Sequence, residues 1–257
     1  EPGDLRLEDV DKPEPGPGQA VVKVKATGLC GSDVDGYLGH HPWIDYPIIL
    51  GHECSGVVDC VGDEVTDFAP GDPVVVEPFF VCEDCPACDR GEYNLCRDIT
   101  IIGHQVPGSF AEYVLINERF LHTLPENVSF EAGALVEPVS GALHAVGRCD
   151  LSIGDFVVLL GCGTIGYFLA QHALNSGARL LVSEPEAQKR ETARELGADH
   201  VLNPHEDDVL GTVMDLTDGV GADCVLEAAG VQETIRMTTD LGRKGGTVML
   251  MGWTGED

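Results

Sequence analysis

The chain has 257 residues, enough for two ordinary domains, and 43% of them are hydrophobic, as in a globular protein. Its 44 Asp and Glu residues against 15 Lys and Arg give a formal net charge of −29, and a field of that sign repels nucleic acid and anionic membranes. No apolar run reaches membrane-spanning length, so neither nucleic acid nor a membrane is expected as a partner.

The chain contains ten cysteines, and no basic-then-apolar leader is visible before them. In such a context cysteines indicate metal-binding or catalytic thiols rather than a disulfide framework. We therefore expect a reducing compartment, the cytoplasm.

The first part of the chain predicts mostly strands. Residues 19–26 alternate apolar and polar side chains, as a half-buried strand does. Further strands are expected at 55–62, 72–78 and 108–116. Residues 129–149 are helical in pattern, with Ser129 as the N-cap and Pro138 as an interruption.

A glycine-flanked stretch between the first two strands holds Cys30 and, further along, the adjacent pair His52 and Glu53. All three side-chain types bind Zn²⁺, and a catalytic zinc site uses three protein ligands and leaves one position open. The flanking glycines allow tight turns that aim separated side chains at one point. The alternative is a buried Cys and a core His in two unrelated turns.

Residues 82–96 hold four cysteines with the spacing C-x2-C-x2-C-x7-C: Cys82, Cys85, Cys88 and Cys96. Four thiolates this close can complete a tetrahedral zinc site with no open position, which predicts a structural role. An iron–sulfur cluster competes for such a set. Four unpaired surface thiols are disfavoured, because exposed free cysteines are reactive.

From residue 151 onward strands and helices alternate, which predicts a parallel sheet with right-handed crossovers. The boundary between the two patterns is expected near Cys149–Gly154, giving domains 1–150 and 151–257. Strands are expected at 155–161, 179–185, 200–204, 222–230 and 246–252, and helices at 164–177, 186–197, 207–216 and 232–240.

A G-x-G-x-x-G sequence ends the first strand of this second part and opens a helix, and an acid, Glu184, follows at the end of the next strand. In that context the glycines predict a dinucleotide-binding turn, with the pyrophosphate at the helix N-terminus and Glu184 on the ribose hydroxyls. The expected cofactor-binding residues of the turn are Gly161, Gly163, Thr164, Ile165 and Gly166.

Glu184 favours NAD, because a 2′-phosphate beside it would meet a like charge. NADP remains possible, since Lys189 and Arg190 follow shortly afterwards and an Arg near this site can accommodate that phosphate. Ser183 could also hydrogen-bond it.

Taken together, CGSD at residues 30–33, GHE at residues 51–53, the four-Cys segment and GCGTIG resemble the zinc-dependent medium-chain dehydrogenases over essentially the whole chain. The LVEP segment around Glu137 is more similar to the polyol branch, with its sorbitol-, butanediol- and iditol-type enzymes, than to the alcohol dehydrogenase branch, where a Cys occupies that position. Read alone, Glu137 would be a solvated helix charge. The resemblance implies a β-rich, GroES-like catalytic domain followed by an α/β Rossmann nucleotide-binding domain.

The resemblance also implies roles for particular residues. Cys30 and His52 would bind catalytic zinc, with Glu53 as a direct or exchangeable ligand. Glu137 would be a fourth ligand or hold the zinc-bound water. Ser32 would take the alcohol proton, and Asp33 would orient His52 without touching the metal. The implied reaction is hydride transfer between an alcohol or polyol CH–OH group and NAD(P), in a homo-oligomer, dimeric or tetrameric.

Two departures from the family pattern stand out. Many relatives carry a proton-relaying His where this chain has Asp35, so His40, His41 or solvent would have to serve instead. The nucleotide domain also has five predicted strands where the family has six, and the chain begins with Glu, in EPGDLRLEDV, as if a strand had been cut away. We therefore expect a chain truncated at both ends. Two other functions compete: a zinc-free NADPH-dependent enone or quinone reductase, disfavoured by the Cys30, His52 and Glu53 set, and a zinc-ribbon module for nucleic acid, disfavoured by the charge.

Overall fold

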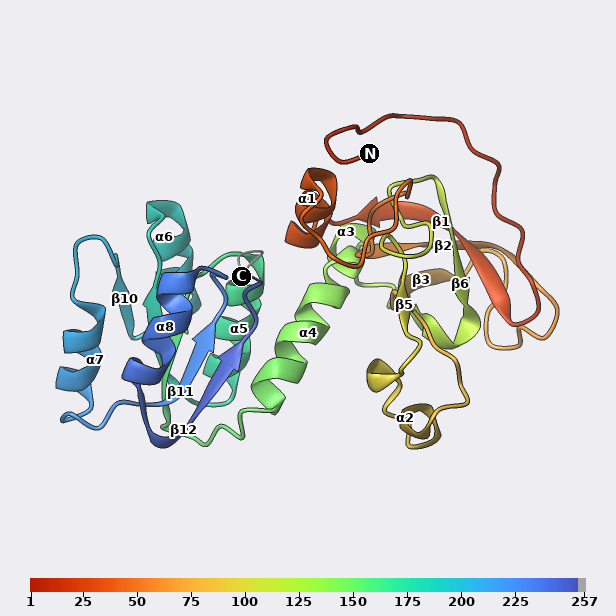
Figure 1. Cartoon of the computed structure of the whole chain (residues 1–257). Coiled ribbons are helices and arrows are strands. Elements are labelled where there is room, and N and C mark those ends of the chain that lie inside the picture. Colours follow the sequence, from red (N-terminus) through yellow and green to blue (C-terminus); the bar gives the residue numbers. More distant parts are fainter. Residues whose placement is uncertain (254–257) are drawn as a thin grey trace. The chain divides into compact units, whose positions relative to one another are not determined.

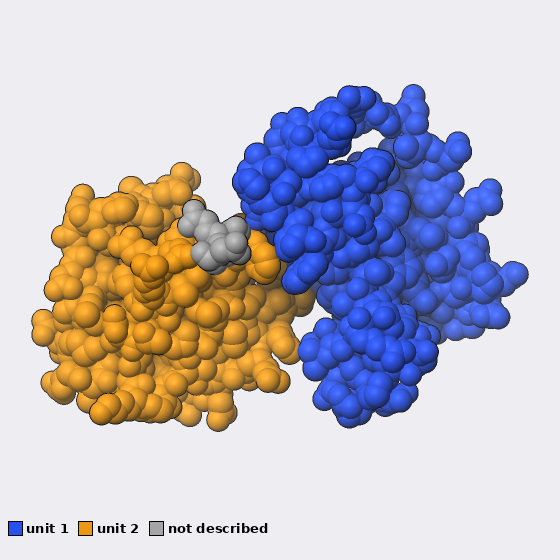
Figure 2. All heavy atoms as spheres, viewed as in Figure 1, with its two compact units in different colours: residues 1–137 blue, residues 138–257 orange. Residues whose placement is uncertain are grey.

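The structure is a computed structural model that describes residues 1–253. The chain divides into two compact units, Glu1–Glu137 and Pro138–Asp257 (Figure 2). Within the described residues, none of the helices has both the length and the apolarity that crossing a membrane requires.

The first unit is built on a five-stranded antiparallel sheet in the order β6-β1-β2-β3-β7 (Figure 1). Its valine-rich strands pack one face into a core with Ile102 and Phe120, because alternate side chains of a strand point to the same side. The strands are β1 (Gln19–Thr27), β2 (Cys54–Val61), β3 (Pro73–Val76), β6 (Tyr113–Asn117) and β7 (Leu121–Thr123).

Shorter elements decorate this sheet. The strands β4 (Phe79–Phe80) and β5 (Thr100–Ile101) pair with each other. The helices are α1 (Gly31–Leu38), α2 (Pro86–Asp89) and α3 (Phe130–Ala134), with 3₁₀ turns η1 (Tyr93–Leu95) and η2 (Glu118–Phe120).

The strand expected at 108–116 starts only at Tyr113. The backbone N–H groups of Gly108, Ser109 and Phe110 donate to the carbonyls of Ile49, Gly51 and Leu50. Residues 108–110 therefore bond to the chain just before β2 instead of joining the sheet. The prediction was wrong at this end because periodicity carries no information about such a loop partner.

The helix expected over 129–149 is two helices. Ser129 does cap the first, its Oγ accepting from the N–H of Ala132. The break falls at Leu135, and α4 (Val136–Gly147) follows with Pro138 in its first turn. Proline has no N–H to donate to the carbonyl four residues earlier, Ala134, so the preceding turn ends there.

The second unit is a five-stranded parallel sheet in the order β10-β9-β8-β11-β12. The strand order reverses between β8 and β11, the point of an open α/β sheet where ligands bind beyond the strand ends. The strands are β8 (Phe156–Leu160), β9 (Arg179–Ser183), β10 (His200–Leu202), β11 (Ala222–Glu227) and β12 (Gly242–Leu250).

Helices cover both faces of this sheet, and the alternation can be followed in Figure 1. Val157 and Leu159 pack with residues of α4, α5 and α6, whereas Phe156, Val158 and Leu160 pack with residues of α7 and α8. The crossover helices are α5 (Thr164–Asn175), α6 (Ala187–Leu196), α7 (Val209–Leu216) and α8 (Gln232–Leu241).

These observations confirm the predicted combination of a β-rich domain and a Rossmann-type domain. Helix α4 contributes Ala142, Ala145 and Val146 to the core of the second unit. The expected domain boundary at residue 150 lies beyond this helix, and it stays a prediction.

Candidate functional site

The structure brings Cys30, His52 and Glu53 together. Cys30 is the N-cap of α1, and His52 and Glu53 lie immediately before β2. One donor atom from each side chain lies within 4.8 Å of the other two. His52 and Glu53 are both only 6% exposed, so the three donors converge on a largely buried point. Sulfur, nitrogen and oxygen donors in this arrangement fit zinc.

Asp33 ties the two halves of this site to each other. It is buried, its Oδ2 accepts from the N–H of Cys30 at 2.9 Å, and its Oδ1 accepts from the N–H of Gly51 at 3.0 Å. Burial alone would raise the pKa of Asp33, but His52 and the two backbone donors outweigh burial and lower that pKa. Asp33 therefore bonds to the backbone on both sides of the site, at the expected ligand Cys30 and at Gly51, the residue before His52.

His52 faces the same carboxylate. Its Nδ1 lies 3.6 Å from Asp33 Oδ1, too far for a hydrogen bond, and it has no hydrogen-bond partner among residues 1–253. Burial lowers the pKa of His52, yet Asp33 and Cys30 together raise it to about 10. A site that favours a positive imidazolium this strongly is electrostatically suited to a cation.

Glu53 depends on a glycine for its position. A Cβ placed on Gly28 would lie 2.0 Å from Glu53 Oε2, and the Gly28 N–H donates to the Glu53 carbonyl at 2.7 Å. Burial raises the pKa of Glu53, partly offset by His52 and Cys30. Glycine at position 28 is thus required by the close approach of the carboxylate.

Glu137 lies outside the cluster of three donors, but the charges of that cluster affect its pKa. It is in the first turn of α4. Burial raises the pKa of Glu137, the charge of His52 opposes that shift, and Glu53 adds to it. Within the described chain, the Glu137 carboxylate is not among the groups whose donor atoms meet within 4.8 Å. Its expected role as a zinc ligand stays a prediction.

Ser32 lies in the first turn of α1, half-buried, two residues after Cys30. His40 is exposed, whereas the ring of His41 contacts that of His104, with centroids 4.5 Å apart. Of the two histidines proposed to replace the missing relay residue, His41 is thus the one connected to His52, through the ring of His104.

His104 is a residue that sequence reasoning missed. Its ring packs edge-on against that of His52, with centroids 5.1 Å apart, and it is 6% exposed. Burial, with help from the charges of His52 and His41, lowers its pKa to about 4. No motif includes it, since it is a single histidine in a turn after β5.

The four cysteines expected to form a structural site also converge. The sulfur atoms of Cys82, Cys85, Cys88 and Cys96 all lie within 4.8 Å of one another. Backbone N–H groups, chiefly those of Cys88 and Arg97, lower the pKa of Cys85 to about 6, which favours the thiolate that zinc binds. A third group, Cys82 with Asp84 and Asp98, shares Cys82 and has exposed carboxylates, so four thiolates are the better donor set.

The glycine-rich turn lies at the end of β8, where the strand order reverses. A Cβ on Gly166 would lie 2.1 Å from the carbonyl oxygen of Gly161, so Gly166 is required by packing within the turn. A Cβ on Gly163 would meet nothing within 4 Å in the described chain. Packing therefore does not explain Gly163, and its expected approach to a pyrophosphate at the N-terminus of α5 stays a prediction.

Glu184 follows β9 and is buried. Its Oε2 accepts from the N–H of Cys162 at 2.7 Å, inside the glycine-rich turn, and its Oε1 accepts from the N–H of Glu186 at 2.8 Å. Arg190 donates to the carbonyls of Glu184 and Pro185, and Lys189 pairs with Glu186 at 2.6 Å. Both cations thus bond to the β9–α6 turn itself.

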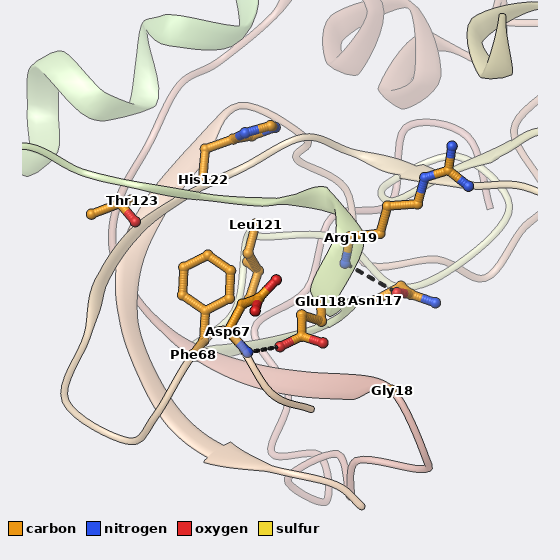
Figure 3. Close-up of a pocket in the computed structure, with 9 residues that line it drawn as sticks. All are labelled: Gly18, Asp67, Phe68, Asn117, Glu118, Arg119, Leu121, His122 and Thr123. Atoms are coloured by element: carbon orange, nitrogen blue, oxygen red, sulfur yellow. Dashed lines mark hydrogen bonds between the residues drawn. The ribbon is translucent and has the colours of Figure 1, made fainter. Parts of the chain in front are cut away.

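A separate hollow of about 650 Å³ lies on the first unit (Figure 3). Glu118 lines it and accepts from the N–H groups of Thr66 and Asp67, so the carboxylate anchors a loop. The lining residues are Gly18, Asp67, Phe68, Asn117, Glu118, Arg119, Leu121, His122 and Thr123. They include none of the expected site residues, and this hollow is not the candidate site.

Comparison with known families gives two matches along the chain. Residues 16–126 match the model for an alcohol dehydrogenase GroES-like domain, and residues 164–257 match the model for a zinc-binding dehydrogenase.

Individual relatives agree. A sorbitol dehydrogenase from Halalkalibacterium halodurans is 39% identical over 247 residues, which cover 94% of this chain and 72% of that protein. An L-threonine 3-dehydrogenase from Pyrococcus abyssi is also 39% identical, over 96% of this chain and 72% of its own length. A structure from Sinorhizobium meliloti, described as a zinc-binding dehydrogenase bound to NADP, superposes with a TM-score of 0.93 at 37% identity, covering 99% of this chain and 75% of that one.

Proposed function

Because the chain belongs to the zinc-dependent medium-chain alcohol and polyol dehydrogenases, we propose that it oxidises a secondary hydroxyl of a polyol and passes the hydride to NAD. The observation that carries this proposal is the convergence of Cys30, His52 and Glu53 on one buried point.

Cys30, His52 and Glu53 would hold the catalytic metal, and the four cysteines the structural one. When bound, zinc supplies a Lewis acid to the hydroxyl oxygen, and the nicotinamide supplies the hydride acceptor. Asp33 keeps the two halves of the ligand set together through its bonds to Cys30 and Gly51. It also places a negative charge beside the His52 ring, as the carboxylate partner of a metal-binding histidine does.

Ser32 would accept the proton of the substrate hydroxyl at its Oγ. It lies two residues from Cys30 in the first turn of α1 and is not fully buried. From Ser32 the proton has to reach solvent without a histidine at position 35. Glu137, whose pKa is raised by burial, would set the charge near the metal and contribute to the alcohol step alone.

The glycine-rich turn would bind the pyrophosphate at the N-terminus of α5, using Gly161, Gly163, Gly166 and the backbone of Thr164 and Ile165. Glu184 favours NAD, because its buried carboxylate repels a 2′-phosphate. Arg190 is engaged by two backbone carbonyls and would have to leave them to bind that phosphate.

The substrate class rests on the sorbitol dehydrogenase relative and on the Glu137 segment. The equal identity to a threonine dehydrogenase makes L-threonine the second candidate. A screen of the purified protein with sorbitol, 2,3-butanediol, L-threonine and 2-propanol, each with NAD and with NADP, separates them. Zinc-dependent polyol oxidation with NAD that is lost in Cys30→Ser supports the proposal, whereas activity on enones that survives chelation contradicts it.

We infer in addition a homo-oligomer, dimeric or tetrameric, in the cytoplasm. All ten cysteines are free thiols, as in a reducing compartment. Light scattering coupled to gel filtration measures the first point, and cell fractionation the second.

A further inference from the structure

Glu227, the last residue of β11, is a carboxylate buried in the second unit, with 0% of its surface exposed. Its Oε1 accepts from the N–H groups of Ala229 and Gly230, both at 2.9 Å, and from the hydroxyl of Thr234 at 2.7 Å. Its Oε2 has no hydrogen-bond partner among residues 1–253. A buried carboxylate is costly unless it is hydrogen-bonded, so the bonds to Oε1 are what stabilise Glu227 in this place.

The segment that Glu227 bonds, residues 228–230, is a turn next to the glycine-rich turn. The Ala228 N–H donates to the carbonyl of Leu160, the last residue of β8, at 2.9 Å. A Cβ on Gly161 would lie 2.9 Å from the backbone nitrogen of Ala229. The two turns therefore lie side by side at the carboxyl ends of β8 and β11, where the strand order reverses and where open α/β sheets bind their ligands.

The 228–230 turn is accessible, but its conformation is fixed. Ala229 is exposed, and Ala228 and Gly230 are half-buried. The segment after β12 packs against the same turn, so closely that a Cβ on Gly252 would lie 2.2 Å from the backbone nitrogen of Gly230. A ligand can thus contact the turn itself, while the carboxylate that holds the turn stays buried beneath it.

We propose that Glu227 is a positioning residue for the dinucleotide. Through its bonds to Ala229 and Gly230 it fixes the 228–230 turn beside the glycine-rich turn, so that both turns contact the cofactor. This inference rests on the proposed function, because it assumes that this edge of the sheet binds NAD. Unlike Glu184, Glu227 is too deeply buried to meet a 2′-phosphate, so NAD and NADP should depend on it alike.

The test measures the dissociation constants of NADH and NADPH, by cofactor fluorescence, in Glu227→Leu and Glu227→Gln. Leucine fills most of the volume and removes all three hydrogen bonds, so we expect both dissociation constants to rise about tenfold or more, by the same factor. Glutamine keeps an acceptor where Oε1 lies, so both values should stay within about threefold of wild type. Zinc content should be unchanged in both variants, because the expected zinc ligands lie in the other unit.

Asp223 provides the matched control, because it bonds the backbone at the opposite end of the same two strands. Its Oδ2 accepts from the N–H of Phe156, the first residue of β8, at 2.7 Å. Asp223→Ala should lower the midpoint of thermal unfolding and leave both dissociation constants unchanged. A further measurement needs no variant to fold: in ¹⁵N-labelled wild type, NADH should shift the amide signals of Ala229 and Gly230 and leave that of Phe156 in place.

Four results would each overturn the inference. They are a destabilised Glu227→Leu with unchanged dissociation constants, a Glu227→Gln as weak in binding as Glu227→Leu, an equal loss of affinity in Asp223→Ala, and unshifted amides of Ala229 and Gly230. Wild-type protein that binds neither NADH nor NADPH would instead remove the proposed function.

Discussion

Asp33 Oδ1 accepts a hydrogen bond of 3.0 Å from the N–H of Gly51, the residue immediately before His52. The other oxygen of the same carboxylate bonds the N–H of Cys30. Two expected zinc ligands separated by 22 positions thus share one buried anchor, so we expect the geometry of the metal site to depend on it.

Replacing Asp33 by Asn tests this dependence. Asn keeps the shape but can accept at only one of its two positions, and it removes the charge facing His52. Zinc affinity of the catalytic site should fall about 10- to 100-fold, measured by competition with a chelator. Asp35→Asn, in the same helix, is the control and should leave zinc affinity unchanged. Equal zinc affinity in Asp33→Asn and wild type would contradict the anchoring role.

Zinc uptake should release a proton from His52. In metal-free protein the pKa of His52 is raised to about 10, so its imidazole is charged at pH 7–8 and must lose that proton to bind metal. Apparent affinity should rise about tenfold per pH unit below pH 10 for this proton. Calorimetry in two buffers of different ionisation enthalpy measures the release, with Cys30→Ser as the blank for the four-cysteine site. Affinity that is flat from pH 7 to pH 9 would exclude a protonated His52.

The same raised pKa of His52 also predicts how the stability of metal-free protein depends on pH. A folded-state pKa above the ordinary value of 6.5 stabilises metal-free protein fully below pH 6.5, and that contribution is lost as pH rises towards about 10. Chelated protein should therefore become less stable across this interval, in denaturant titrations compared with His52→Gln.

The four-cysteine site should matter for stability more than for chemistry. Cys88→Ser removes one of four converging thiols, and we expect the midpoint of thermal unfolding to drop by about 5 °C or more while the protein that stays folded keeps a near-normal KM. Cys60→Ser, a half-buried cysteine of β2 outside that group, is the control. Unchanged stability with collapsed turnover would be the opposite of a structural role.

Gly28→Ala should displace Glu53. The new Cβ would lie 2.0 Å from Glu53 Oε2, so the carboxylate has to move away from Cys30 and His52. Zinc occupancy and turnover should both fall at least about tenfold. A Cβ on nearby Gly31 meets nothing within 4 Å in the described residues, which makes Gly31→Ala the matched control. Full activity in Gly28→Ala would show that Glu53 is dispensable.

Cofactor choice should depend on Glu184. We expect wild type to have the higher kcat/KM with NAD, and Glu184→Ser to move that ratio towards NADP, because the like charge against a 2′-phosphate is gone. Glu184→Gln separates charge from hydrogen bonding, since its amide oxygen can still accept from Cys162. A wild-type preference for NADP would mean that Lys189 and Arg190 outweigh the carboxylate.

The parts of the site that the sequence predicted are those written in local spacing. The four cysteines at positions 82–96 lie in one short segment, so their sulfur atoms meet largely through local structure. The glycines at 161–166 likewise form one local turn before α5. The residue types and flanking glycines only suggested that Cys30 and His52 meet, and the family resemblance strengthened that prediction. Their meeting depends on Asp33 bonding two distant segments, which local spacing does not encode.

His104 lay beyond such reasoning for a physical reason. It reaches His52 because the turn after β5 bonds to Asp45 and Trp43 and packs on Gly51, and no periodic pattern encodes those contacts. The early start predicted for β6 failed in the same way, because residues 108–110 bond to residues 49–51.

The bond between Glu184 and the Cys162 N–H has a practical consequence for redesign. The residue expected to bind the ribose thus also bonds to the turn expected to receive the pyrophosphate. We therefore expect a single substitution of Glu184 to alter two recognition elements at once. It should lower the affinity for both NAD and NADP while changing which of them is preferred. An engineer who wants one change without the other has to supply a new acceptor for Cys162 from elsewhere in the turn, in the same step that removes the carboxylate.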